Sequence, residues 1–145
     1  SIKNIIEENE LIIQLKKMSR KFNTAQFLFE SDYKPNKLLN FIKKFKSNKF
    51  GINYDTGNSA SLNYDFSKEK VYFKYVKNIH IKDRKKKSKT IRLGQGNWNY
   101  KKFFNFLRKK QYTGNFILQT ARSNKKKHIE EILINKNFFE KHYFV

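Results

Sequence analysis

The chain has 145 residues, no cysteine and a formal net charge of +21. Its length suits one domain with a substantial core, and the lack of cysteine excludes disulfides and thiolate metal ligands. No apolar stretch reaches the length of about 18 residues that a membrane helix needs, and no basic-plus-apolar leader is present, so we expect a soluble, cytoplasmic protein with no membrane partner.

The first part of the chain alternates helical and extended patterns. Apolar residues at helical spacing predict a first helix over 9–22: Leu11, Ile12, Leu15, Met18 and Phe22. A short apolar strand is expected at 26–30. Pro35 then marks the start of a second helix, with its own apolar stripe: Leu38, Leu39, Ile42 and Phe45.

The alternation continues to the end of the chain. A strand at 50–55 and a loop of small residues at 56–60 precede a helix near 67–76 that buries Val71, Tyr72, Tyr75 and Val76. A strand at 78–82 leads into a long basic loop, then a helix at 99–110. A strand at 115–119 is followed by a terminal helix that carries Ile129, Ile132 and Leu133. Four strands alternating with helices, with no internal boundary over 1–145, predict an α/β fold with a parallel sheet.

Each strand carries a possible metal ligand at or near its end: Glu30, Asp55, His80 and Gln119. The carboxyl ends of parallel strands meet at one edge of the sheet, so these side chains are expected to converge. The layout is that of one half of a (β/α)8 TIM barrel, which needs eight strands and typically about 250 residues. We therefore expect the N-terminal half to be missing, this fragment alone to be inactive, and its unpaired edge strands to favour a homo-oligomer.

Five stretches, in order, resemble the C-terminal half of the sugar phosphate isomerase/epimerase family, which has the xylose-isomerase-like TIM barrel: FLFESD, GINYDTGNSASLNYD, KNIHIKDR, RLGQGNWN and GNFILQTAR. The resemblance covers residues from about 24 to 122. It implies a small sugar or sugar phosphate as substrate. It also implies one divalent metal ion (Zn, Mn, Mg or Co) at the carboxyl face, with ligands Glu30, Asp55, His80 and, at the fourth position, Gln119.

The same resemblance implies an isomerase or epimerase that moves a proton on the carbon next to a metal-polarised carbonyl, with Glu30 as the catalytic base. Gln119 stands where sugar epimerases of the group often carry Glu. Its amide oxygen can bind a metal but cannot take a proton at neutral pH. The substrate would be bound by Asn58, which stands where many relatives carry a second His, and by Lys82, Arg84 and Arg122, of which the two arginines suit a phosphate.

Simpler interpretations compete with this site. Asp55 can cap the turn that follows it, Glu30 can pair with a lysine, and His80 can be a structural histidine. Gly94 and Gly96 fit a plain turn better than a phosphate loop. An endonuclease-IV-like phosphodiesterase acting on DNA is the alternative enzyme, although three histidines supply few ligands for its several metals. A catalytically inactive barrel fragment is the third interpretation.

The basic charge favours a coding bias over a nucleic-acid surface. Only five of the 33 basic residues are Arg, whereas surfaces that read phosphates and bases depend on the guanidinium group. Asn, Ile, Phe and Tyr, the residues of AT-rich codons, are also frequent. We therefore expect no nucleic-acid partner, with a selected basic surface as the second interpretation.

Overall fold

The computed structural model of the chain describes residues 5–123 and 126–144. Its centre is a parallel sheet with the strand order β1-β2-β3-β6. The bounds of these strands are Phe27–Phe29, Phe50–Asp55, Val76–Ile81 and Asn115–Leu118. Beyond the carboxyl end of β3, a small antiparallel hairpin pairs β4, Asp83–Arg84, with β5, Thr90–Ile91.

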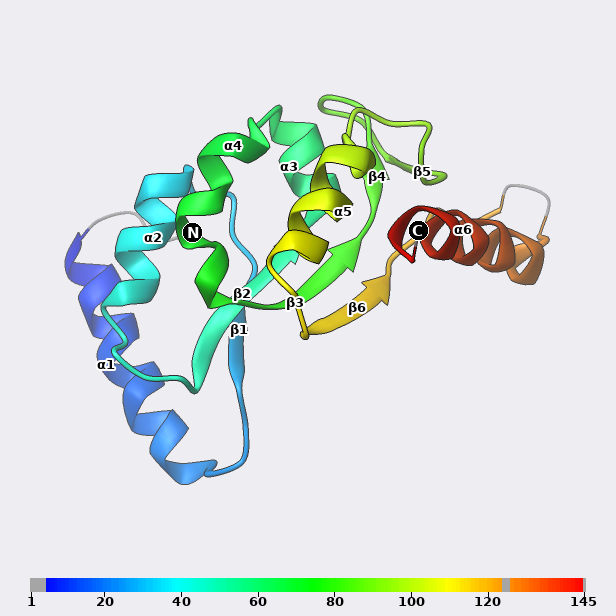
Figure 1. Cartoon of the computed structure of the whole chain (residues 1–145). Coiled ribbons are helices and arrows are strands. Elements are labelled where there is room, and N and C mark those ends of the chain that lie inside the picture. Colours follow the sequence, from blue (N-terminus) through cyan, green and yellow to red (C-terminus); the bar gives the residue numbers. More distant parts are fainter. Residues whose placement is uncertain (1–4, 124–125, 145) are drawn as a thin grey trace.

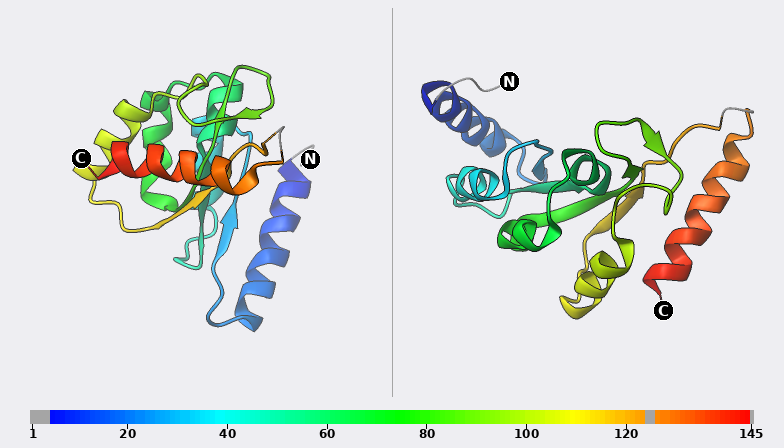
Figure 2. Two further views of the ribbon diagram at one scale, coloured as in Figure 1. Left: turned by 90° about the vertical axis from the view of Figure 1, so that its right-hand side faces the viewer. Right: turned by 90° about the horizontal axis from the view of Figure 1, so that it is seen from above.

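Helices precede, join and follow the strands, and those that join them lie along one face of the sheet (Figure 1; Figure 2, right). They are α1 (Ile5–Lys21), α2 (Pro35–Lys43), α3 (Thr56–Leu62), α4 (Phe66–Glu69), the 3-10 helix η1 (Lys70–Tyr75), α5 (Tyr100–Lys109) and α6 (His128–Tyr143). Helices α1 and α6 lie at opposite ends of the sheet (Figure 1). The alternation of parallel strands and helices confirms the predicted α/β half-barrel, because the crossover helices cover the outer face of the strands.

The hydrophobic core lies between the sheet and these helices. On the sheet side it contains Ile52, Ile79 and Ile81, whose side chains are almost inaccessible to solvent. Helix α5 supplies Phe103 and Leu107 from the other side. Phe103 stacks on Tyr54 with ring centroids 5.5 Å apart. Burial of these side chains therefore determines which face of each strand packs against the helices. The alternate residues of each strand point to the opposite face of the sheet.

The opposite face of the sheet is polar. Asn53, Asn78 and Asn115 are paired across β2, β3 and β6, and Asn78 Nδ2 donates a hydrogen bond to Asn53 Oδ1. Ile117 on the same face is 49% exposed. The interior of a closed barrel is usually packed with bulky branched residues. This face instead carries the amide side chains of three asparagines.

Several predicted details were wrong. The expected loop at 56–60 is helix α3, whose N-cap is the carboxylate of Asp55. The expected helix at 67–76 is divided into α4 and η1, Val76 belongs to β3, and Val71 is exposed. The spacing of the apolar residues could not separate α4 from η1, because a 3-10 helix has nearly as many residues per turn as an α-helix.

The two terminal helices also differ from the prediction. Helix α1 begins at Ile5, earlier than expected. In α6 the three apolar residues that marked the predicted helix are exposed: Ile129, Ile132 and Leu133. Helix α6 instead buries Asn135 and Phe139, because a hydrogen bond and an aromatic contact set its rotation. Within the described residues, no helix is long and apolar enough to cross a membrane.

Candidate metal centre

Three potential metal ligands meet at the carboxyl edge of the sheet. Glu30 follows β1, Asp55 ends β2 and His80 lies near the end of β3. One ligand atom from each lies within 4.8 Å of the other two. Nδ1 of His80 is 3.4 Å from Oε2 of Glu30 and 4.0 Å from Oδ2 of Asp55. The sequence placed these residues at strand ends, and the parallel sheet brings the three together.

An irregularity between β2 and β3 turns His80 toward the other two ligands. Ile52 pairs with Val76, but Asn53 pairs with Asn78, so β3 contains one extra residue at this point. With the register unbroken, Asp55 would be opposite Ile79, and the imidazole would face the core. The extra residue pairs Asp55 with His80 instead. Such bulges commonly re-aim a side chain at a functional site.

Amide side chains hold the carboxylate of Glu30. Nδ2 of Asn53 donates to Oε2 and Nδ2 of Asn58 donates to Oε1, both at 2.9 Å. The Asn53 amide nitrogen also lies 3.2 Å from Nδ1 of His80. No sequence pattern had singled out Asn53. Its position two residues before Asp55 on the same face of the strand was the available signal.

Asp55 uses its two carboxylate oxygens separately. Oδ1 accepts the backbone N–H of Asn58 at 2.9 Å and caps α3, as the simpler interpretation of this residue expected. Oδ2 points toward His80 and accepts from Nζ of Lys82 at 3.2 Å. The cap therefore leaves the second oxygen directed into the group of potential ligands.

Gln119 joins the site through a lysine. Its Oε1 accepts a hydrogen bond of 2.9 Å from Nζ of Lys82, and its backbone N–H donates to the carbonyl of Ile81. Lys82 thus links Gln119 to Asp55.

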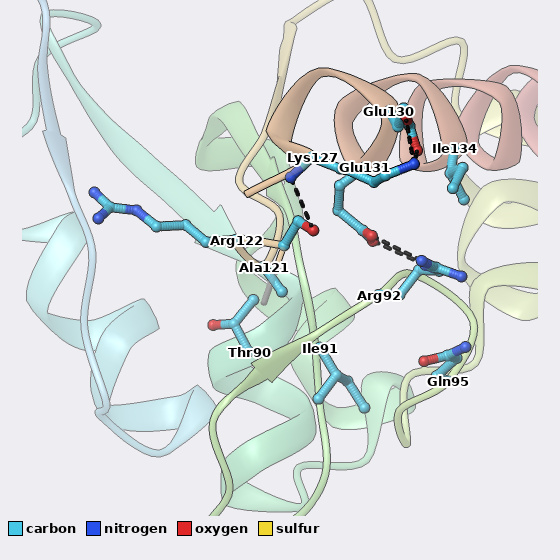
Figure 3. A pocket seen from close by; sticks show the side chains of 11 residues that line it. Thr90, Ile91, Arg92, Gln95, Ala121, Arg122, Lys127, Glu130, Glu131 and Ile134 are labelled. Carbon is cyan, nitrogen blue, oxygen red and sulfur yellow. Dashed lines mark hydrogen bonds and ion pairs between the residues drawn. The ribbon is translucent and has the colours of Figure 1, made fainter. Parts of the chain in front are cut away.

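The expected substrate-binding residues fall into two places. Asn58 and Arg84 contact each other beside Glu30, with Arg84 Nη1 donating to Asn58 Oδ1 at 3.2 Å. Arg122 is exposed and lines a separate cavity of about 650 Å³ between the β4–β5 hairpin and α6. Its side chain points away from the other lining residues (Figure 3). In that cavity Arg92 forms a two-pronged ion pair with Glu131.

The glycine-containing loop after β5 encloses a carboxylate of its own chain. The buried side chain of Asp83 accepts backbone N–H groups from Arg84, Gly94, Gly96 and Trp98. Burial raises the pKa of Asp83 above its ordinary value, and the four N–H donors oppose that rise. The loop amides are thus already satisfied by Asp83, which agrees with the expected structural turn.

The donor chemistry fits a divalent cation. Two carboxylates and one imidazole are ligands that Zn²⁺, Mn²⁺ and related hard or borderline ions accept, and neighbouring amides orient Glu30. Glu30 is partly exposed, whereas Asp55 is buried, so one side of the group is open to solvent. The three residues could therefore hold a metal ion at a position open to solvent on the Glu30 side.

A family model described as xylose isomerase-like TIM barrel matches residues 2–138. No curated protein sequence matches the chain. Solved structures with similar folds include three proteins described as xylose isomerase-like or as an epimerase. A xylose isomerase domain protein from Planctomyces limnophilus has a TM-score of 0.78 and 17% identity, with coverage of 100% of this chain and 59% of that protein. An L-ribulose 3-epimerase has a TM-score of 0.74 and 16% identity, with coverage of 99% of this chain and 56% of that protein.

The third is a xylose isomerase-like TIM barrel protein from Mycobacterium smegmatis in complex with magnesium. Its TM-score is 0.64 at 16% identity, with coverage of 94% of this chain and 53% of that protein. At such low identity these likenesses establish the fold alone. The chain spans little more than half the length of the three structures.

Proposed function

The chain belongs to the xylose isomerase-like TIM barrel family, and from that premise we propose that it serves a metal-dependent isomerase or epimerase of a small sugar or sugar phosphate. The observation that carries the proposal is the meeting of Glu30, Asp55 and His80 at the carboxyl edge of the sheet. Active sites of TIM barrels lie at this edge. The likeness to L-ribulose 3-epimerase supports a ketose as substrate.

The proposed metal ligands are Glu30, Asp55 and His80, with the amide oxygen of Gln119 as a fourth. A bound divalent cation would supply Lewis acidity at a substrate carbonyl. Asp55 is suited to a fixed ligand role, because its other oxygen is held by the N-terminus of α3. Asn53 and Asn58 keep Glu30 beside His80 through the two amide hydrogen bonds.

Glu30 is the proposed base. It would take a proton from the carbon next to the carbonyl; the C–H electron pair would form a C=C bond and the carbonyl π pair would move onto the carbonyl oxygen, giving an enediolate. Return of the proton to the former carbonyl carbon, with the neighbouring hydroxyl proton passing to the enediolate oxygen, gives the aldose–ketose isomer, whereas return to the opposite face of the original carbon gives the epimer. One carboxylate suffices for the first outcome. The second needs another proton donor, which the amide of Gln119 cannot be.

Asn58, Lys82, Arg84 and Arg122 are the proposed substrate-binding residues. Asn58 and Arg84 are supported by their place beside Glu30. Arg122 lines its own cavity, so its proposed contact is with a distant phosphate group rather than with the reacting carbons.

We further propose that residues 1–145 form a single domain, the C-terminal half of the barrel, and that activity belongs to the whole barrel. The coverage of little more than half of the related structures supports this proposal. The exposed polar face of the sheet supports it as well, since Ile117 and Asn115 lack cover there. Four further strands would close the sheet and remove its two edges.

Solvent exchange tests the function. The intact protein with Mn²⁺ is incubated with ketoses and their phosphates in deuterated water, and incorporation of deuterium next to the carbonyl is followed by NMR. We expect exchange in the parent and none in Glu30→Gln, with Glu10→Gln on α1 as the charge-matched control. Exchange at the parental rate in Glu30→Gln with metal still bound would show that Glu30 is not the base.

A DNA phosphodiesterase is the second candidate, and the net charge of +21 is the observation that favours it. Several metals would be needed for that chemistry. Over residues 5–123 and 126–144, the side chains capable of holding a metal form a single group of three. Metal-dependent cleavage of a duplex with an abasic site, without exchange of any sugar proton, would favour this candidate over the isomerase.

A further inference from the structure

Lys82 places an ammonium group inside the candidate metal centre. Its Nζ donates to Oδ2 of Asp55 at 3.2 Å and to Oε1 of Gln119 at 2.9 Å. The lysine side chain is only 16% exposed. Asp55 and Gln119, two of the four proposed metal ligands, are therefore both hydrogen-bonded to the ammonium group of Lys82.

The backbone and the aliphatic side chain of Lys82 are also held by neighbouring residues. The Thr56 hydroxyl donates to the carbonyl of Lys82 at 2.6 Å and lies 2.9 Å from its N–H, and the Tyr100 hydroxyl donates to the same carbonyl at 2.9 Å. The stem crosses Gly57, where an added Cβ would lie 2.6 Å from Cγ of Lys82. A lysine held at its backbone, stem and tip differs from the freely solvated lysines of the surface.

We propose that Lys82 sets the metal affinity of this site by competing with the divalent cation for Asp55 and Gln119. The proposal rests on the metal site of the proposed function. A cation that binds Oδ2 of Asp55 must approach an ammonium that is 3.2 Å from the same oxygen, and like charges at such range repel strongly when water is partly excluded. A cation that takes Gln119 as a ligand must also remove its hydrogen bond to Lys82.

Charge explains why Gln119 matters here. With Gln at this position, the proposed ligands carry only the two negative charges of Glu30 and Asp55, and Lys82 compensates one of them. The amide of Gln119 anchors the ammonium without adding charge. The site would therefore bind a metal weakly and release it readily, and Lys82 is a positioning residue that acts through Asp55 and Gln119.

Calorimetric titration of the intact protein with Mn²⁺ tests the proposal. Lys82→Met removes the ammonium and should lower the Mn²⁺ dissociation constant by about tenfold or more, whereas Lys82→Arg should stay near the parent because the charge is kept. Lys85→Met in the following loop is the matched control for loss of one positive charge and should change affinity less than about twofold. Should Lys82→Met fail to fold, Lys82→Gln takes its place.

The outcomes separate this inference from the proposed function. Unchanged affinity in Lys82→Met would overturn the competition, and weaker binding would mean that Lys82 instead helps to position Asp55 as a ligand. Both results would leave the metal site standing. Absence of Mn²⁺ binding in the parent and in every variant would overturn the metal site and the competition together.

Discussion

Oε2 of Glu30 lies 3.4 Å from Nδ1 of His80, although β2 separates the strands that carry them. Side chains next to alternate strands therefore meet across the intervening strand. Asn53 of β2 occupies the space between them and lies within hydrogen-bonding distance of both. The arrangement suggests that Asn53 orients the two outer ligands as a neighbouring amide does in many metal sites.

Asn53→Ala should therefore weaken Mn²⁺ binding by about 10- to 100-fold, the usual effect of losing an orienting group. The reason is that Glu30 loses one of its two amide donors while the ligands themselves remain. Asn115→Ala, on the same face of the sheet but in the edge strand β6, is the control and should leave affinity unchanged. Calorimetry makes the comparison, and equal affinities in the two variants would contradict the role of Asn53.

Gly96→Ala should destabilise the protein by about 2–3 kcal/mol, because overpacking a closed site forces its neighbours apart. An added Cβ would lie 2.0 Å from Oδ1 of Asp83 and 2.7 Å from the carbonyl of Arg84. Lys87→Gly in the preceding loop is the control and should not destabilise the protein, because Lys87 has a φ of 52° that glycine adopts without strain. Urea denaturation measures both, and a Gly96→Ala protein as stable as its parent would refute the packing argument.

Asn135 fastens α6 to the loop before α5. Its fully buried side chain accepts the N–H of Leu93 at 2.8 Å and donates to the carbonyl of Glu131 at 2.6 Å. Asn135→Ala leaves that N–H without its side-chain acceptor and should cost about 1–3 kcal/mol of unfolding free energy. Asn135→Asp keeps an acceptor but places a buried carboxylate oxygen against the carbonyl and carboxylate of Glu131, so it should lose at least as much. If the two variants unfold at the same urea concentration as the parent, the hydrogen bond does not fix α6.

Glu69 should make stability depend on pH. Its buried carboxylate accepts hydroxyl hydrogen bonds from Tyr54, Ser59 and Tyr72, yet burial raises the pKa of Glu69 above its ordinary value near 4.5. A pKa raised by folding favours the native state below the ordinary value, and that contribution is lost as pH rises through the raised value.

The measurement compares unfolding free energies of the parent and Glu69→Gln between pH 4 and 7. The parent's stability relative to this variant should decline as pH rises. Glu10→Gln removes a carboxylate at an exposed position on α1 and is the control for the loss of one negative charge. A difference that stays constant, or that grows in favour of the parent with rising pH, would contradict the direction of the Glu69 shift.

Sequence patterns predicted the strands well because each parallel strand is a short apolar run ended by a polar residue. The ends at Asp55 and Glu30 follow directly from that pattern. The orientation of His80 did not, because it depends on one extra residue in β3 that shifts the register against β2. Periodicity along one strand carries no information on its pairing with the next.

Side chains that bind other parts of the chain were the harder features to predict. Asp83 and Lys82 are neighbours in a polar stretch, yet one is enclosed by backbone N–H groups and the other joins Asp55 to Gln119. The apolar residues that marked the predicted α6, Ile129, Ile132 and Leu133, are exposed, whereas its polar Asn135 is fully buried. These placements depend on tertiary contacts between distant segments, which local patterns do not encode.

Titration of the intact protein with Co²⁺, followed by its visible absorption, detects the metal centre itself. We predict one bound Co²⁺ per chain with a spectrum that reports nitrogen and oxygen ligands. That signal should be lost in His80→Ala and in Asp55→Ala and retained in His128→Ala, which removes a histidine from the start of α6. An unchanged Co²⁺ spectrum and stoichiometry in His80→Ala would contradict the metal centre.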